Sequence, residues 1–347
     1  MKYLRIVILM VPVLMAGCLE IETTTRVNID GSIERSVQLK GSASSLSGTR
    51  FNMPRHDLNS WQVTTDSLGD DRFLYHAVAN FESVEKLNHS FEQNTQDPGV
   101  KIKASLVLDE GIFFKRYFYK ENIWADLPGP NLSMDPYLSQ AELEALLEHD
   151  VEGSDSTLDS LESVRLEHQW ERFMKQLIYE DFLMELREGG QLSGHLEAID
   201  GMLAEHSDSL LTILEKTNFY DENLVWKSIL TRYVAASIID DVDAANTHGF
   251  ARFYESWQFF EDVLMDSYTF SVELPGVIQN TSTGNVDGHR MTWEPESIRL
   301  FFGGFSLEAE SSKAKPGTMI FAGLLLLLIV ILILAWSLRP KRGKQAV

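Results

Sequence analysis

The chain has 347 residues and a single cysteine, Cys18, so its folded part contains no intramolecular disulfide. Proline is absent between Pro136 and Pro275, and so long a gap favours a compact block of helices. The sequence has no His-Glu-x-x-His zinc motif, no Gly-x-Ser-x-Gly nucleophile elbow and no glycine loop followed by Lys-Ser or Lys-Thr. These absences exclude the common metalloprotease, serine hydrolase and nucleotide-binding motifs, and we expect no cofactor.

Basic residues are scarce outside the two ends of the chain. Residues 19–312 hold 22 Lys and Arg against all 51 Asp and Glu of the sequence, a net charge of about −29. Nucleic acid and anionic lipid surfaces are poor partners for a field of this sign. We therefore expect no nucleic-acid partner. Cations and basic proteins match this surface better, and the charge is also consistent with a role in solubility alone.

Residues 1–17 are typical of a secretory signal. Two cations precede an apolar run of about ten residues, which is shorter than the roughly 20 residues needed to cross a bilayer. The segment 14–18, Leu-Met-Ala-Gly-Cys, is similar to a bacterial lipobox, in which cleavage before the cysteine is coupled to lipidation of its thiol. We expect Cys18 to be lipidated. An ordinary signal peptide that leaves Cys18 as a free thiol is the alternative.

A second apolar run, from Met319 to Leu338, predicts a transmembrane helix over residues 318–338. Twenty helical residues span about 30 Å, which matches the hydrocarbon core of a bilayer. Four cations follow in residues 339–344, against two on the other flank, and this bias favours a cytoplasmic C-terminus. We therefore expect a cytoplasmic basic tail over 339–347 and a bulk that lies outside the cytoplasm of a bacterial cell.

Strand patterns occupy residues 18–134 and return over residues 267–312. Apolar and polar residues alternate on both sides of Asp30-Gly31, which predicts a hairpin over residues 21–39. The same pattern around Asp109-Glu110-Gly111 predicts a second hairpin over residues 101–119. We expect these two regions to come together in one sheet domain.

Apolar residues recur at helical spacing between residues 135 and 266. One helix runs through Trp170 and Phe182, and we expect it to end at Gly189-Gly190. Aromatic residues over 250–260 cover more of a helix than one buried stripe needs, so a partner or lipid groove is an alternative to core packing. The predicted fold class is α+β: an antiparallel sheet domain with a large helical insertion, plus one C-terminal transmembrane helix.

The lengths of the connections predict how the domain meets the membrane. Very few residues separate Cys18 from the first strand, and about five separate Ser311 from the apolar run. We therefore expect both ends of the sheet to lie at the same bilayer surface, with the helical insertion facing away from it.

One acidic cluster has the residue types of a hard-metal site. Asp240, Asp241 and Asp243 lie a few residues before His248, and carboxylate oxygens are the ligands that Ca²⁺ and Mg²⁺ prefer. Runs of acidic residues at a helix end are also ordinary solvated or capping groups. We assign no metal site and keep these four residues as candidates.

Several segments together resemble the LppM-like bacterial cell-envelope lipoproteins. Gly17-Cys18 is followed by a Thr-rich strand and the turn over residues 28–32, and an aromatic hairpin covers residues 111–119. The segment 270–276 then precedes Trp293 and the terminal apolar run. The resemblance covers the two strand regions and both ends, not residues 135–266. It implies a β-rich ectodomain between a lipid and a helix, and binding of envelope lipids or proteins.

These observations favour a non-enzymatic, membrane-anchored extracytoplasmic lipoprotein that acts as a binding or assembly module of the cell envelope. Its expected partners are the membrane itself, through the lipid and the single span, and another envelope protein or lipid. Two alternatives stay open: a membrane-tethered hydrolase with an acidic, metal-loaded site near residues 240–248, and a sensor that acts through a membrane partner.

Overall fold

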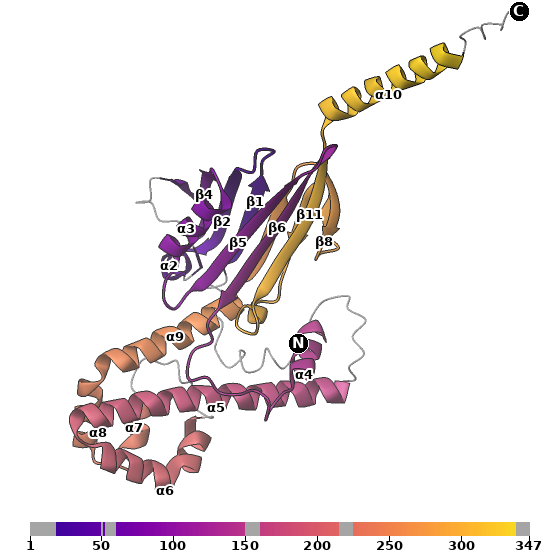
Figure 1. Cartoon of the computed structure of the whole chain (residues 1–347). Coiled ribbons are helices and arrows are strands. Elements are labelled where there is room, and N and C mark those ends of the chain that lie inside the picture. Colours follow the sequence, from indigo (N-terminus) through magenta and orange to yellow (C-terminus); the bar gives the residue numbers. More distant parts are fainter. Residues whose placement is uncertain (1–18, 50, 53–59, 150–159, 215–224, 338–347) are drawn as a thin grey trace, which may run out of the picture.

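The computed structural model describes residues 19–49, 51–52, 60–149, 160–214 and 225–337. Over these ranges the chain forms two β-sheets, with a block of helices at one end and the apolar helix α10 (Pro316–Ser337) at the other (Figure 1). The predicted α+β class, with a large helical insertion and an apolar C-terminal helix, is confirmed.

The larger sheet combines strands from both sides of the helical insertion. The predicted first hairpin is present as β1 and β2, and β1 also lies parallel to β7, with Glu20 opposite Ser267. The other strand pairs of this sheet are antiparallel. The strand order is β3 (Gln62–Gly69), β4 (Arg72–Phe81), β2 (Ile33–Ser42), β1 (Glu20–Val27), β7 (Ser267–Glu273), β10 (Arg290–Trp293) and β9 (Val286–Asp287).

The smaller sheet is antiparallel throughout and contains the second predicted hairpin, which is longer than expected. Its central pair, β6 and β11, stays in register from Phe305 opposite Ile123 to Ala314 opposite Phe114. The strand order is β5 (Val100–Glu110), β6 (Phe114–Ala125), β11 (Phe305–Ala314) and β8 (Val277–Thr281).

The two sheets face each other and enclose the core between them. Alternate residues of β1 and β6 are buried, as expected for strands with one face turned inward. An ion pair crosses the interior: Arg35 of β2 donates through Nη1 to Glu121 Oε2 of β6 at 2.9 Å, and both side chains are fully buried. The helix α3 (Val84–Asn94) packs against β5 and β4, and Phe91 of this helix lies under the Arg35 guanidinium.

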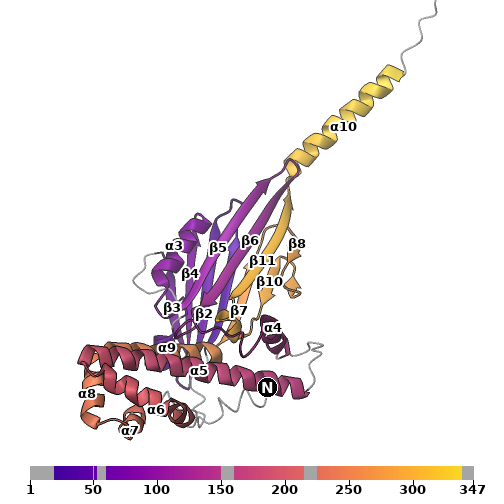
Figure 2. The ribbon, with the colours of Figure 1, turned by 60° about the horizontal axis from the view of Figure 1, so that its bottom comes forward.

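The helical block is built on one long helix, α5, against which α4, α6, α8 and α9 pack (Figure 2). Its aromatic contacts join it to the sheets, since Phe260 of α9 packs on Phe301 and Trp170 of α5 packs on Phe302. The helices of the block are α4 (Gln140–His149), α5 (Ser160–Ser193), α6 (Leu196–Leu214), α7 (Val225–Leu230), α8 (Ala236–Ala245) and α9 (Thr247–Met265); two short helices, α2 (Ala43–Gly48) and η1 (Ser297–Leu300), lie outside it.

The expected end of the long helix at Gly189-Gly190 is wrong, because α5 continues to Ser193. A β-carbon on Gly189 would lie 2.8 Å from Val242 of α8, and one on Gly190 would lie 3.1 Å from Ile199 of α6. The two glycines therefore serve close helix packing rather than termination. The chain turns only at Gly194, which has a φ of +79°.

The groove suggested by the aromatic residues of α9 is not formed. Phe250, Phe253 and Trp257 are buried within the helical block, and Phe259 and Phe260 are buried against Phe301. The apolar face of α9 is wider than one stripe because this helix packs on two partners, the other helices on one side and the η1 segment with Phe301 on the other.

The expectation that both ends of the sheet meet the same surface is also wrong. Leu19 lies at the end of β1 that adjoins α9, since its carbonyl oxygen accepts from Ser267 N–H. The opposite end of β1 leads into a turn whose Ile29 carbonyl accepts from Tyr117 of β6, close to the start of α10. At about 3.3 Å per strand residue, Leu19 and α10 are roughly 30 Å apart. Connection lengths do not reveal strand direction, and the parallel pairing with β7 sets it.

Candidate functional site

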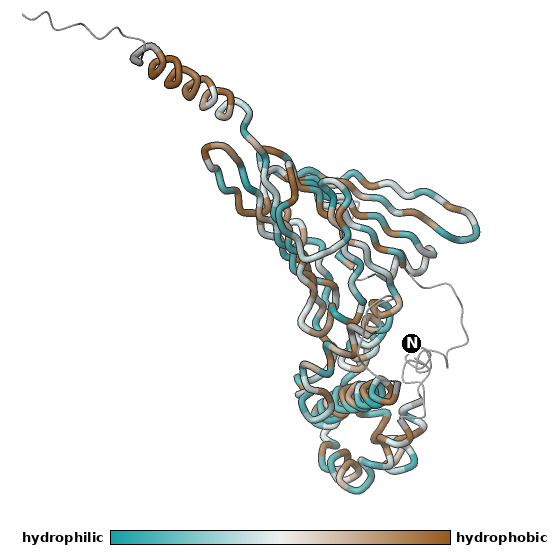
Figure 3. Tube along the Cα trace, turned by 90° about the vertical axis from the view of Figure 1, so that its right-hand side faces the viewer, coloured by the Kyte–Doolittle hydropathy of each residue, from teal (hydrophilic) through white to brown (hydrophobic). Residues whose placement is uncertain are grey.

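The helix α10 is the most distinctive functional element of the described chain. It is, within the described ranges, the one helix that is long and apolar enough to cross a membrane, and none of its most apolar stretch is buried by the rest of the chain. Figure 3 shows it as a continuous hydrophobic segment that extends away from the sheets. A 22-residue helix spans about 33 Å, which suits the hydrocarbon core.

The base of α10 is fastened to the β5–β6 hairpin. The backbone N–H of Lys315 donates to the Phe113 carbonyl oxygen at 2.8 Å, and Lys315 Nζ donates to Glu110 Oε2 at 2.6 Å. Lys115 pairs with the other oxygen of Glu110 at 2.9 Å. These two lysines hold the pKa of the Glu110 carboxyl at about 2, chiefly through their hydrogen bonds. The carboxyl is therefore charged at any physiological pH, and it bridges the hairpin and the helix.

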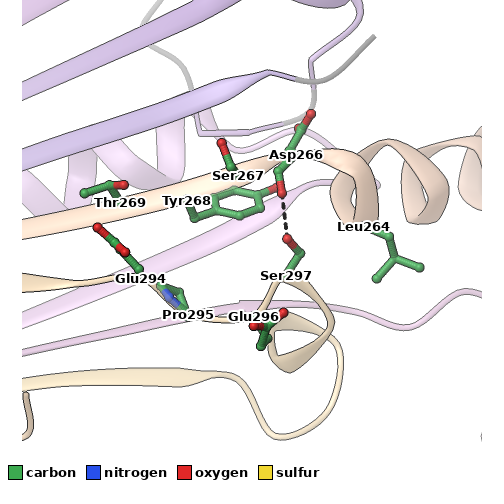
Figure 4. A pocket seen from close by; sticks show the side chains of 9 residues that line it. All are labelled: Leu264, Asp266, Ser267, Tyr268, Thr269, Glu294, Pro295, Glu296 and Ser297. Carbon is green, nitrogen blue, oxygen red and sulfur yellow. Dashed lines mark hydrogen bonds between the residues drawn. The ribbon is translucent and has the colours of Figure 1, made fainter. Parts of the chain in front are cut away.

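A second candidate is a cleft of about 390 Å³ where α9 passes into β7, beside the segment that leads into η1 (Figure 4). Ser297 Oγ donates to the Asp266 carbonyl oxygen at 2.6 Å and so fixes this segment against the end of α9. Three carboxylates and four hydroxyls line the cleft, and none of its lining residues is basic. The lining residues are Leu264, Asp266, Ser267, Tyr268, Thr269, Glu294, Pro295, Glu296 and Ser297.

The electrostatics of the cleft centre on Asp266. Burial raises the pKa of its carboxyl to about 7, while the hydrogen bond from Leu19 N–H at 2.9 Å lowers it and the charge of Asp262 raises it further. Burial also raises the pKa of the Tyr268 hydroxyl well above its usual range, and this hydroxyl has no hydrogen-bond partner within the described residues. The carboxyl of Asp266, which titrates near neutral pH, thus points to Leu19, while its carbonyl oxygen faces Ser297 in the cleft (Figure 4). With Glu294 and Glu296 in its lining and no basic residue, the cleft favours cationic over anionic ligands.

The sequence-based candidates are distributed differently. Cys18 lies outside the described residues, next to Leu19. Asp240 and Asp243 both pair with Lys227 of α7, and Asp241 pairs with His195 at 3.1 Å. Among the described residues, His248 makes no hydrogen bond or ion pair with the three aspartates. In the described part of the chain, no three His, Cys, Asp or Glu side chains come together as a metal site.

The cleft around Asp266 was not among the sequence-based candidates. The change from helical to alternating periodicity marks Asp266 as the junction between α9 and β7, but no local signal places residues 294–297 beside it. Asp266 is one of 51 acidic residues in the sequence, and its burial is set by neighbours that are far away in the chain.

No protein-family model matches this chain, and no curated protein matches it in sequence. Among solved structures, the chain is distantly similar to the folded domain of the LppM protein of Mycobacterium tuberculosis, determined by NMR. The identity is 8% and the TM-score 0.32, over 88% of this chain and 97% of that one. Similarity at this level carries no argument about function, and membership of an LppM-like family stays a prediction.

Proposed function

We propose that this chain is a non-enzymatic, membrane-anchored module of the bacterial cell envelope that presents its helical block for binding or assembly outside the cytoplasm. The observation that carries the proposal is the position of α10. This uncovered apolar helix leaves the sheets at the end opposite to the helical block, so a bilayer around α10 has the sheets between it and the helices.

The charge distribution supports the same arrangement. The net charge of about −29 over residues 19–312 opposes close contact with anionic lipid along the whole surface. Cations instead flank α10, with Lys313 and Lys315 before it and four more in residues 339–344 after it. The larger group after the helix favours a cytoplasmic C-terminus.

Thiol accessibility tests this topology. In a Cys18→Ser background, Leu192→Cys places a single thiol on an exposed position of α5, and Ala346→Cys places one in the basic tail. A membrane-impermeant maleimide added to spheroplasts is expected to label position 192 at once and position 346 only after lysis. Labelling of position 346 in intact spheroplasts, or protection of position 192, would contradict the proposal.

A second candidate function, a tether between two membranes, is favoured by the position of Leu19. If Cys18 carries a lipid, that lipid emerges next to Leu19, at the end of the sheets roughly 30 Å from α10. The buried Leu19 side chain and its bond to Asp266 leave little slack for the lipid to reach the bilayer of α10. We infer that the lipid inserts into an opposing membrane.

Membrane fractionation distinguishes the tether from the simpler anchor. A tether is expected to appear in the fractions of both membranes, and the Cys18→Ser variant only in the fraction that holds α10. The intact mass of the native protein serves as the control, since it must correspond to a chain that starts at an acylated Cys18. Identical fractionation of the two proteins would exclude the tether and leave the anchored module standing.

The hydrolase alternative has no geometric support in the described residues, because the carboxylates near residues 240–248 are paired with Lys227 and His195. The sensor alternative, which would act through a membrane partner, is favoured by no observation in the described residues.

A further inference from the structure

The tip of the β5–β6 hairpin exposes three consecutive apolar residues. Ile112, Phe113 and Phe114 are 76%, 41% and 45% exposed, at the point where the hairpin reverses direction. Exposed large side chains are ordinary when they are scattered, but three adjacent ones on a loop form a patch that normally has a partner. No other part of the described chain covers them.

The tip of the hairpin lies at the base of the apolar helix α10. Phe113 is bonded through its carbonyl oxygen to Lys315, the residue directly before α10, and Phe114 lies opposite Ala314 in the sheet. Two views show the tip at the base of α10 (Figures 1 and 2). The exposed apolar tip of the hairpin therefore lies at the base of the uncovered apolar helix.

The charge around the tip is opposite in sign to the rest of the ectodomain. Four cations, on β6 and at or just after the end of β11, accompany two carboxylates on β5 and one in the β1–β2 turn, so the charge around the tip is about +1. Lys and Arg side chains beside an apolar anchor interact favourably with lipid phosphates. The charged residues are Asp30, Asp109, Glu110, Lys115, Arg116, Lys313 and Lys315.

From this we propose that the β5–β6 hairpin tip inserts into the interface of the bilayer that α10 crosses, as a second contact with the membrane. Aromatic side chains such as Phe113 and Phe114 are suited to the boundary between headgroups and acyl chains. Because β6 pairs with β11 up to α10, the tip and the helix form one hydrogen-bonded unit. The inserted tip fixes the tilt of the sheets and keeps the helical block away from the bilayer. This inference rests on the proposed membrane span.

Depth-dependent quenching tests the insertion. The full chain carries Cys18→Ser and one new cysteine, labelled with an environment-sensitive fluorophore, in nanodiscs of phosphatidylcholine and phosphatidylglycerol. Three positions are compared: Phe113→Cys at the tip, Leu328→Cys in the middle of α10, and Leu68→Cys. Leu68 is a matched control because it is an exposed residue of the β3–β4 hairpin, which lies at the opposite end of the sheets beside Glu20.

Nitroxide lipids with a shallow label are expected to quench position 113, and those with a deep label position 328. Neither should quench position 68. Quenching at 328 without quenching at 113 would overturn the insertion while leaving the span intact. Absence of quenching at 328 would overturn the span, and the insertion with it.

A second comparison separates insertion from mere proximity to α10. Adding Ile112→Ser and Phe114→Ser to the Phe113→Cys protein removes the apolar side chains that drive insertion and leaves the backbone bond to Lys315 in place. Loss of quenching at 113, with quenching at 328 unchanged, is the expected result. Unchanged quenching at 113 would show that the neighbouring helix alone holds this position near lipid, and would overturn the proposal.

Discussion

The backbone N–H of Leu19 donates a hydrogen bond of 2.9 Å to the carboxylate of Asp266, a residue 247 positions later in the sequence. This bond ties the start of the first strand to the exact point where the helical block returns to the sheets. It also fixes the N-terminal end of the described chain at the end of the sheets far from α10. The parallel pairing of β1 with β7, which sets the distance between Leu19 and α10, begins at this junction.

The Asp266 junction makes stability depend on pH. The folded-state pKa of about 7 lies above the ordinary value of 3.8, so between these values the folded state binds the proton and the unfolded state releases it. The contribution of the Asp266 carboxyl to the free energy of unfolding is therefore fully present below about pH 4, and it is lost as the pH rises through 7. Between pH 5 and pH 8 the free energy of unfolding is expected to fall by up to roughly 3 kcal/mol through this carboxyl.

Urea unfolding of the full chain in detergent, followed by tryptophan fluorescence at pH 5 and pH 8, measures this loss. The Asp266→Asn variant keeps an oxygen that accepts from Leu19 and cannot titrate, so its loss of stability between the two pH values is expected to be smaller than that of the wild type. An equal loss in both proteins would show that Asp266 does not titrate in this range.

Removing one member of the buried Arg35–Glu121 pair is predicted to lower the free energy of unfolding strongly. Replacing both residues by apolar ones is predicted to change it little. Glu121→Leu leaves the fully buried Arg35 without its partner and is expected to destabilise the fold by about 3–5 kcal/mol. The double variant Arg35→Met with Glu121→Leu removes both charges, and its free energy of unfolding is expected to lie near that of the wild type. A double variant as unstable as Glu121→Leu would contradict this account.

Substitution by alanine at two helical glycines is predicted to change the stability of the fold in opposite directions. In the helical block, Asn246 donates to the Glu185 carbonyl and carboxylate, each at 2.9 Å. A β-carbon on Gly249 would collide with both side chains, so Gly249→Ala is expected to cost about 1–3 kcal/mol. Gly201 of α6 has open space around it, and Gly201→Ala is expected to gain up to about 1 kcal/mol. Thermal unfolding of both variants checks the contrast, and a stable Gly249→Ala protein would refute it.

Local patterns predicted much of the secondary structure. The alternation around Asp30-Gly31 and Asp109-Glu110-Gly111 located both hairpins, because the residues that fix a hairpin are neighbours in sequence. The predicted helix end at Gly189 and Gly190 was wrong, because a glycine that ends a helix and a glycine that allows close packing of a neighbouring helix have the same local sequence signal. Only the fold reveals that Val242 and Ile199 are those neighbours.

The candidate sites were harder to predict for the same reason. The parallel pairing of β1 with β7 joins residues that are almost 250 positions apart, and no local pattern encodes it. That pairing decides which end of β1 lies far from α10, and it places Leu19 beside Asp266. The helix α10 could be predicted from the sequence because a membrane span is a continuous run of apolar residues.

In the proposed arrangement, the sheets stand between the bilayer and the helical block. Energy transfer from single labelled cysteines to acceptor-labelled lipid headgroups in nanodiscs tests it directly, with the full chain in a Cys18→Ser background. Transfer is expected to be highest at Val277→Cys, beside Ser312 at the end nearest α10, lower at Leu68→Cys, and lowest at Leu192→Cys in the helical block. Transfer at position 192 that equals or exceeds transfer at position 277 would place the helices on the bilayer and contradict this arrangement.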